Sequence, residues 1–423
     1  MSKKIFYSLA LFLVTLLSFS LYSQDINRAR ETIEILSAPD MHGRGYVNNG
    51  DKIAAEYIQE RFEQIGLKKI KNSYFQKFTF DINTFPGQVK LHSNRRKFVP
   101  GEDYILKPFS GAGKGRGRLV YFDTLALQDS EVRNEFLKKN LKRKIVVYDG
   151  DYYGRMIEFP GIVEKVHEAK AVVELESNKL TMGLSSKQYS RPFFQVYADS
   201  FDQSARRARF KVEAELIKDY ESQNVIGYVR GKTNPDSLVV ICAHYDHLGR
   251  LGEDTYFPGA NDNASGTAML LELADYYAKP ENQMNFSIAF IAFGAEEAGL
   301  VGSKYFVDNP LFPLKNIKFL VNLDMMGTGD DGVMVVNGKV FENEFQTLKA
   351  INKEHNLLPQ IKARGEAANS DHYFFYLRGV PCFFLYTLGG IAAYHDVFDK
   401  AETLPLTRFE EVFTLLNKFV GGF

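Results

Sequence analysis

The alternation of apolar runs and helical patterns over residues 223–423 is the feature that most limits the possible folds. Five apolar runs have the length of strands and lie at Asn224–Val229, Ser237–Ala243, Phe286–Phe293, Phe319–Leu323 and Val380–Tyr386. Segments with apolar residues at helical spacing lie at Ala264–Ala278, Gly299–Val307, Glu342–His355 and Thr407–Val420. This alternation predicts an α/β fold, with a mainly parallel mixed sheet that is flanked by helices.

The first 85 residues divide into a leader and a helical part. Lys3 and Lys4 precede the apolar run Ile5–Phe19, and small residues follow, which predicts a signal peptide over residues 1–23. The alternative is an uncleaved membrane anchor, for which the run is short. We therefore expect an exported protein, periplasmic or extracellular, with no stable membrane span after cleavage. Residues 24–85 are expected to be the N-terminal part of the domain that continues at 216–423.

Residues 86–215 have a different pattern, in which short apolar runs alternate with charged turns. Four of these runs stand at Arg118–Phe122, Lys144–Tyr148, Ala171–Leu175 and Pro192–Val196. The pattern predicts a small β-rich module inserted into the chain, which contributes no metal ligand. The basic stretch Arg206–Lys211 is expected to be a solvated strand edge.

Charge and cysteine content exclude two classes of protein. Lys and Arg number 52, as do Asp and Glu, so the formal net charge is zero and a broad nucleic-acid surface is not expected. Two cysteines are too few for a disulfide framework. Cys242 and Cys382 lie in apolar runs, where we expect buried free thiols, with a single bridge between them as the alternative.

Polar residues follow the predicted strands at the point where each strand ends. They are His244 and Asp246, then Glu296 and Glu297, then Asp324, then Tyr394 and His395. Asp262 lies in a loop just before a predicted helix. Open α/β sheets bind ligands at the carboxyl ends of their strands, so we expect these side chains to converge.

Bound metal would remove the repulsion between the converging carboxylates. Two like charges about 4 Å apart repel by about 4 kcal/mol at an effective dielectric near 20. Asp262, Glu297 and Asp324 supply three negative charges, and two divalent ions supply four positive charges, which leaves one charge for a bridging hydroxide. Imidazole and carboxylate ligands favour zinc, with cobalt or manganese as the alternatives, so the sequence predicts two Zn²⁺ ions.

Five segments of this sequence resemble the M28 family of co-catalytic zinc peptidases, which are mostly aminopeptidases. They are Ala243–Gly249, Gly259–Gly266, Phe293–Ser303, Asn322–Gly327 and Tyr394–Asp396. The resemblance implies the zinc-exopeptidase fold, with residues 216–423 as the catalytic domain. The 86–215 module resembles a protease-associated domain.

The resemblance also implies a ligand set. His244 and Asp324 would hold one zinc ion, Glu297 and His395 the other, and Asp262 would bridge the two.

Three further residues would support the chemistry, according to the same resemblance. Glu296 would be the general base, Asp246 would orient His244, and Tyr394 would hydrogen-bond the developing oxyanion. A cis peptide between Asp262 and Asn263 is also implied.

The expected function is that of an exported metallo-aminopeptidase acting on peptides with a free N-terminus. A glutaminyl cyclase shares the fold but resembles a single-zinc design, in which His244 and Asp324 would be unnecessary as a ligand pair. A peptidase-like ectodomain that only binds a partner would be expected to lack ligands or the base, whereas all five ligands and Glu296 are present.

Overall fold

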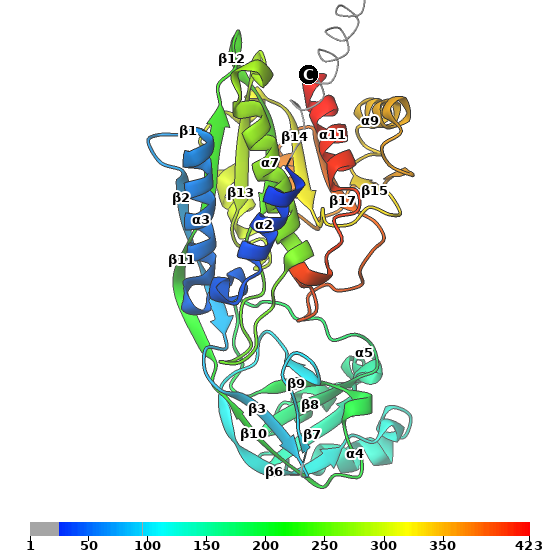
Figure 1. Ribbon diagram of the computed structural model, residues 1–423. Coiled ribbons are helices and arrows are strands. Elements are labelled where there is room, and N and C mark those ends of the chain that lie inside the picture. Colours follow the sequence, from blue (N-terminus) through cyan, green and yellow to red (C-terminus); the bar gives the residue numbers. More distant parts are fainter. Residues whose placement is uncertain (1–24, 95) are drawn as a thin grey trace, which may run out of the picture.

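Two β-sheets organise the protein. The computed structural model describes residues 25–94 and 96–423, so the predicted signal peptide at 1–23 lies outside the described residues. Figure 1 shows one sheet with its helices above the second, smaller region. Among the described helices, none has both the length and the apolar character that a membrane crossing requires.

The first sheet has four parallel strands at its centre. In the order β13, β12, β14 and β17, they are Phe286–Phe293, Asn234–His244, Ile317–Asp324 and Cys382–Thr387. Five more strands extend the sheet: β1 (Lys68–Lys69), β2 (Phe75–Thr84), β11 (Glu215–Val229), β15 (Val333–Val336) and β16 (Ile361–Ala363). Every residue of β13 is buried, as expected for a strand that is covered on both faces.

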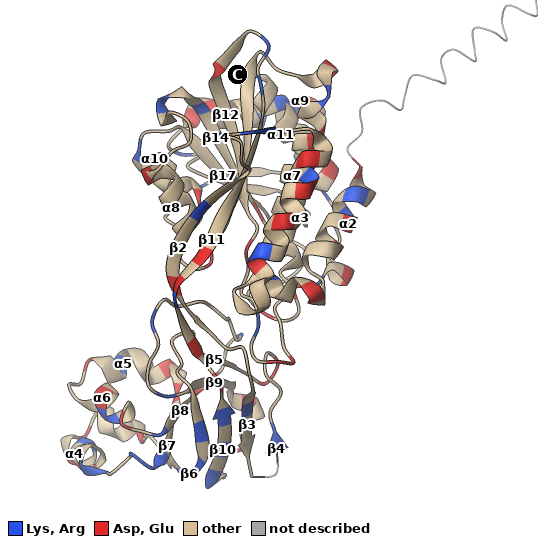
Figure 2. Cartoon of the chain, turned by 90° about the vertical axis from the view of Figure 1, so that its left-hand side faces the viewer, with Lys and Arg blue, Asp and Glu red and all other residues tan. Residues whose placement is uncertain are grey.

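Helices cover both faces of this sheet (Figure 2). One face packs against α2 (Ile26–Leu36), α3 (Gly50–Ile65), α7 (Gly266–Ala278), α9 (Glu342–His355) and α11 (Phe409–Gly421). The other packs against α8 (Val301–Asp308) and α10 (His372–Leu377). The predicted α/β fold, with a mixed sheet flanked by helices, is therefore confirmed.

The second sheet is formed by residues between β2 and β11. Its strands are β3 (Val89–Ser93), β4 (Arg96–Lys97), β5 (Tyr104–Leu106), β6 (Gly113–Tyr121), β7 (Lys144–Asp149), β8 (Ala171–Glu176), β9 (Phe193–Tyr197) and β10 (Arg207–Val212). Their order is β4-β3-β10-β6-β7-β8-β9-β5. Three short helices, α4 (Ser130–Lys138), α5 (Tyr153–Ile157) and α6 (Ile162–Val166), pack on one face of it.

The position of β10 corrects one expectation. The basic stretch Arg206–Lys211 does not form a strand edge, because β10 is hydrogen-bonded to β3 on one side and to β6 on the other. Sheet order joins segments that are far apart along the chain, such as Arg207 and Arg118, and local sequence does not encode it. The prediction for the two cysteines is correct, since Cys242 and Cys382 are buried and free.

Candidate metal centre

The polar residues that follow the strands meet at one edge of the first sheet. His244 and Asp324 are the last residues of β12 and β14. Glu296 and Glu297 follow β13, and His395 lies in the loop after β17. A cavity of about 260 Å³ at this edge is lined by His244, Asp262, Glu296, Glu297, Asp324, Met325, Asn369, Phe384, Tyr386, Tyr394 and His395. Of the eight predicted site residues, only Asp246 is absent from this lining.

Asp262 lies between the two imidazoles. Its Oδ1 is 3.5 Å from His244 Nε2, and its Oδ2 is 3.1 Å from His395 Nε2. His244 Nε2 is also 3.5 Å from Asp324 Oδ1, and His395 Nε2 is 3.2 Å from Glu297 Oε2. The five predicted ligands thus form two groups, His244 with Asp324 and His395 with Glu297, which share Asp262.

These donor atoms fit a pair of metal ions. Asp262 Oδ2 and Asp324 Oδ1 are buried and accept no hydrogen bond from the described residues. Each of these oxygens has an imidazole nitrogen close by, His395 Nε2 at 3.1 Å from Asp262 Oδ2 and His244 Nε2 at 3.5 Å from Asp324 Oδ1. Buried carboxylate oxygens without hydrogen bonds are costly unless a cation compensates them. Imidazole nitrogen with carboxylate oxygen is a donor set that suits zinc.

The turn that carries Asp262 is fixed by neighbouring groups. The Asp262–Asn263 peptide is cis, in agreement with the expectation. The carboxylate of Asp399 accepts hydrogen bonds from the main-chain N–H groups of Asn261 (2.8 Å) and Asp262 (2.9 Å). The amide of Asn263 donates to the carbonyl of Leu323 at the end of β14 (2.9 Å). Asp262 is therefore held by two segments that are distant in sequence.

Arg44 also supports this turn; the Gly43-Arg44-Gly45 loop resembles the N-terminal portion of the M28 family, but the sequence alone assigned no role to Arg44. The side chain is completely buried and donates hydrogen bonds to the carbonyls of Leu36, Tyr245, Pro258, Gly259 and Asp262 at 2.7–3.1 Å. Gly43 precedes it with φ +63°, and a Cβ at Gly43 would lie 2.4 Å from the carbonyl oxygen of Gly249. The available signal was an arginine between two glycines, Gly43 and Gly45.

Asp246 contacts His244 through its main chain rather than through its carboxylate. His244 Nδ1 donates to the main-chain carbonyl of Asp246 (3.2 Å), while the nearer carboxylate oxygen is 3.8 Å away. The Asp246 carboxylate instead accepts from the main-chain N–H groups of Glu296 (3.0 Å) and Glu297 (3.3 Å) and from the hydroxyl of Tyr46 (3.1 Å). One residue thus holds His244 and the turn with both glutamates.

The pKa values of the two adjacent glutamates, Glu296 and Glu297, are shifted in opposite directions. Burial raises the pKa of Glu296 well above its usual range, and Asp371 and Glu297 raise it further against the effect of His244. Burial and Asp262 also act to raise the pKa of Glu297, but His395 and His247 outweigh them and hold it at about 2. His247 Nδ1 lies 2.8 Å from Glu297 Oε1, on the side opposite to His395. Glu297 is therefore a charged partner of imidazoles, whereas Glu296 favours the protonated form.

The loop with His395 contacts the second-sheet region. The ring of Tyr394 stacks on His395, with centroids 3.9 Å apart. Lys179 forms an ion pair with Asp396 (Nζ to Oδ2, 2.6 Å) and donates to the carbonyl of Ala392 (2.8 Å). The second-sheet region supplies none of the five predicted ligands, but it supports the loop that carries one of them.

Comparison with known proteins agrees with this geometry. Residues 224–420 match the model of peptidase family M28. An aminopeptidase of Bacillus subtilis, YwaD, is 34% identical over 168 residues, which are 38% of this chain and 35% of that protein. An aminopeptidase of Pseudomonas aeruginosa is 40% identical over 125 residues, 29% of this chain and 21% of that protein. The matched segments thus span about a third or less of these relatives.

Solved structures extend the similarity of fold to most of the chain. BSAP, a zinc aminopeptidase from Bacillus subtilis, matches with a TM-score of 0.70 and 23% identity, over 95% of each chain. An aminopeptidase from Aneurinibacillus sp. strain AM-1 matches with a TM-score of 0.63 and 23% identity, over 94% of this chain and 93% of that one. The arrangement of both sheets is therefore shared with known structures.

Proposed function

We propose that this protein is an exported metallo-aminopeptidase that removes N-terminal residues from peptides with a free N-terminus, because residues 224–420 match the model of peptidase family M28. The observation that carries the proposal is the position of Asp262, whose two oxygens face His244 and His395. A pair of metal ions needs one carboxylate that lies between two sets of ligands, and Asp262 lies between His244 with Asp324 and His395 with Glu297. The named aminopeptidases among the relatives support the reaction class.

Two zinc ions are the proposed cofactors. His244 and Asp324 would hold one, Glu297 and His395 the other, and Asp262 would contact both. Bound zinc supplies Lewis acidity, which activates a water nucleophile and polarises the scissile carbonyl.

The remaining chemistry belongs to side chains of the same cavity. Glu296 lines it but is not among the groups that contact the imidazole nitrogens, so its carboxylate is free to take a proton from water and pass it to the leaving amine. The high pKa that burial gives Glu296 favours the protonated form in which it would donate. The Tyr394 phenol, adjacent to His395, would hydrogen-bond the developing oxyanion. Asp246 would fix the positions of His244 and both glutamates.

The chain organisation is part of the proposal. Residues 1–23 would be the signal peptide, and residues 24–85 and 216–423 would form the catalytic unit. Residues 86–215 would be an insert similar to a protease-associated domain. The second sheet with its own buried core supports this division.

A panel of aminoacyl chromogenic substrates, paired with N-blocked peptides and run with and without a chelator, tests the proposal. We expect cleavage of the unblocked substrates alone, its loss with the chelator and its return with added zinc. Asp262→Asn should abolish turnover, and Asp254→Asn, at an exposed position, should not. Equal cleavage of N-blocked peptides, or turnover that no chelator affects, would show that the proposed activity is wrong.

A further inference from the structure

The part of the second sheet that is formed by β4, β3, β10 and β6 carries cations on the face opposite to its core. The outward positions of β3, β4, β6 and β10 carry Lys90, His92, Lys97, Lys114, Arg116, Arg118, Arg207, Arg209 and Lys211, which we call the basic face. Figure 2 shows Lys and Arg gathered on these strands, at the end of the molecule away from the first sheet. The residues between them, such as Ala208 and Phe210, are buried in the core behind the sheet.

The register places like charges directly opposite one another. Arg118 faces Arg207 in one row. The next two rows run across the sheet as Arg116, Arg209, His92, Lys97 and as Lys114, Lys211, Lys90. Like charges directly opposite on a sheet destabilise it, so this arrangement costs folding stability. A surface that only faces solvent does not require rows of like charges.

The charges of the basic face are hardly neutralised within the described part of the chain. Only Lys211 has an acidic partner there, Glu213 at 2.5 Å, and the seven other Lys and Arg residues of the face form no ion pair. Burial lowers the pKa of His92, and the charges of Arg209, Lys97 and Lys90 lower it further. Since the whole chain has zero net charge, this is a local excess of positive charge.

The distribution of the cations distinguishes between anionic partners. With about 4.8 Å between strands and about 3.4 Å per residue, the face extends about 14 Å in both directions. The charges therefore form a two-dimensional array, which suits a plane of anions better than a single linear polyanion. No outward position carries Phe, Tyr or Trp, so the face lacks the stacking groups that bind single-stranded bases.

A shallow hollow lies within the array. It has a volume of about 370 Å³ and is lined by Lys90, His92, Lys114, Gly115, Arg116, Arg209, Phe210 and Lys211. Arginine side chains present a planar fork that matches phosphate oxygens, and lysine supplies compact charge. The hollow thus offers room for phosphate head groups between the cations.

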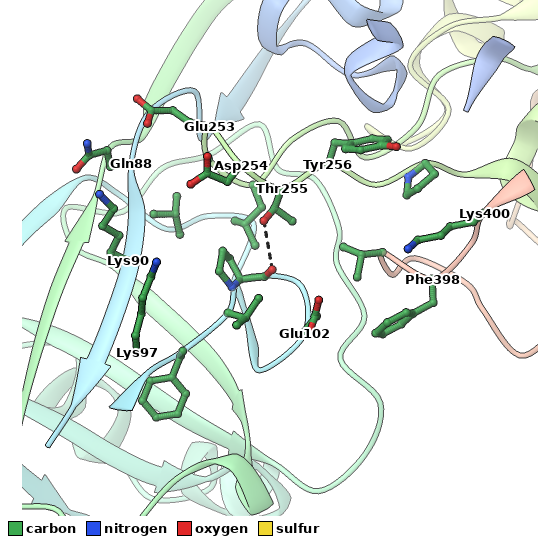
Figure 3. A pocket seen from close by; sticks show the side chains of 18 residues that line it. Gln88, Lys90, Lys97, Glu102, Glu253, Asp254, Thr255, Tyr256, Phe398 and Lys400 are labelled. Carbon is green, nitrogen blue, oxygen red and sulfur yellow. Dashed lines mark hydrogen bonds between the residues drawn. The ribbon is translucent and has the colours of Figure 1, made fainter. Parts of the chain in front are cut away.

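The basic face ends at the junction of the two sheets. Lys90 and Lys97 also line a cleft of about 380 Å³ there, and Figure 3 shows Glu253 and Asp254 on the same cleft. The acids come from the loop after β12. The basic face therefore borders these two acids at the junction, where Glu102 and Lys400 also line the cleft.

We propose that the basic face docks the protein onto a membrane surface rich in anionic phospholipid, with the second-sheet region against the head groups. The inference is independent of the proposed peptidase activity. Attraction of this kind acts over about a Debye length, so it must weaken steeply with salt.

Co-sedimentation with vesicles tests the proposal. The full chain is mixed with vesicles of phosphatidylcholine alone or of phosphatidylcholine with phosphatidylglycerol, at low and high salt. We expect binding only to the vesicles with phosphatidylglycerol, and release at high salt. A triple variant, Lys114→Gln with Arg116→Gln and Arg209→Gln, should bind at least about tenfold more weakly.

A second triple variant is the matched control. Lys349→Gln, Lys353→Gln and Lys362→Gln remove three equally exposed charges from α9 and β16, so net charge changes identically. It should bind like the wild type, and thermal unfolding should show that both variants are folded. Equal loss in both variants, unchanged binding by the first, or binding to soluble duplex DNA or polyglutamate but not to vesicles would overturn the proposal.

Discussion

The main-chain carbonyl of Met182 accepts a hydrogen bond from Nδ1 of His395, at 3.0 Å. The N–H of Met182 in turn donates to the carbonyl of His395, also at 3.0 Å. Because a carbonyl can only accept, Nδ1 of this imidazole must carry a proton, and Nε2 is the ring nitrogen that faces Asp262 and Glu297. A residue of the second-sheet region thus fixes which nitrogen of a predicted metal ligand is available to a metal ion.

Lys179→Met should weaken the metal site that includes His395. Removing the amine breaks the ion pair with Asp396 and the hydrogen bond to Ala392, so the loop loses an anchor next to Met182. Contacts that orient metal ligands typically contribute tenfold or more to affinity, and we expect about a tenfold loss for one of two metal equivalents. Chelator competition measures it directly. Lys187→Met, at an exposed position, is the control; identical affinity in both variants would contradict the role of Lys179.

Glu296→Gln and Glu297→Gln should fail for different reasons. The first keeps shape but cannot take a proton, so we expect kcat at least about a hundredfold lower with metal content unchanged. The second replaces a charged group that contacts His395 and His247 with a neutral amide, which should lower metal content. Metal analysis and turnover on an unblocked substrate separate the two. Wild-type turnover by Glu296→Gln with both metals bound would exclude Glu296 as the base.

Arg44→Lys should destabilise the protein strongly. A lysine amine cannot reach the five carbonyls that the guanidinium contacts, and each buried acceptor left without a donor costs roughly 1–3 kcal/mol. We expect the free energy of unfolding to fall by at least about 3 kcal/mol. Denaturant titration measures it, with the exposed Arg143→Lys as control. Equal stability of the two variants would show that Arg44 is not a structural anchor.

Asp51→Asn should alter the pH dependence of stability. Burial raises the pKa of Asp51 to about 6 from 3.8, although Tyr220 and Ser222 donate hydrogen bonds to its carboxylate. Between these values the folded state binds more protons at Asp51 than the unfolded state does, so the contribution of Asp51 to stability falls as pH rises from about 4 to about 6. The fall attributable to Asp51 is about 3 kcal/mol at most, and Asp51→Asn should remove it. Asp40→Asn, at an exposed position, should keep the wild-type slope; the same slope in Asp51→Asn would refute the assignment.

The sequence predicted elements well where the apolar pattern is unambiguous. Phe286–Phe293 and Glu342–His355 match β13 and α9 residue for residue, because a continuous apolar run and a complete helical period leave little choice. The cavity residues were also predictable, since the carboxyl ends of parallel strands bring His244, Asp324 and the glutamates together. The sequence did not predict the contacts of three further residues, Arg44, Asp399 and Met182. Their contacts are mostly with main-chain groups far away in sequence, and a main-chain group has no sequence signature.

Thr84 and Glu215 are directly opposite one another in the pairing of β2 with β11. Opposed residues of an antiparallel pair are about 5 Å apart, a gap that a two-residue turn can close. The whole second-sheet region could therefore be excised and the ends rejoined as an ordinary hairpin, without disturbing any strand of the first sheet. Such a shortened chain would keep all five predicted ligands. It would lose the carbonyl of Met182, which accepts the hydrogen bond from Nδ1 of His395. Water or a new main-chain contact would then have to accept this hydrogen bond.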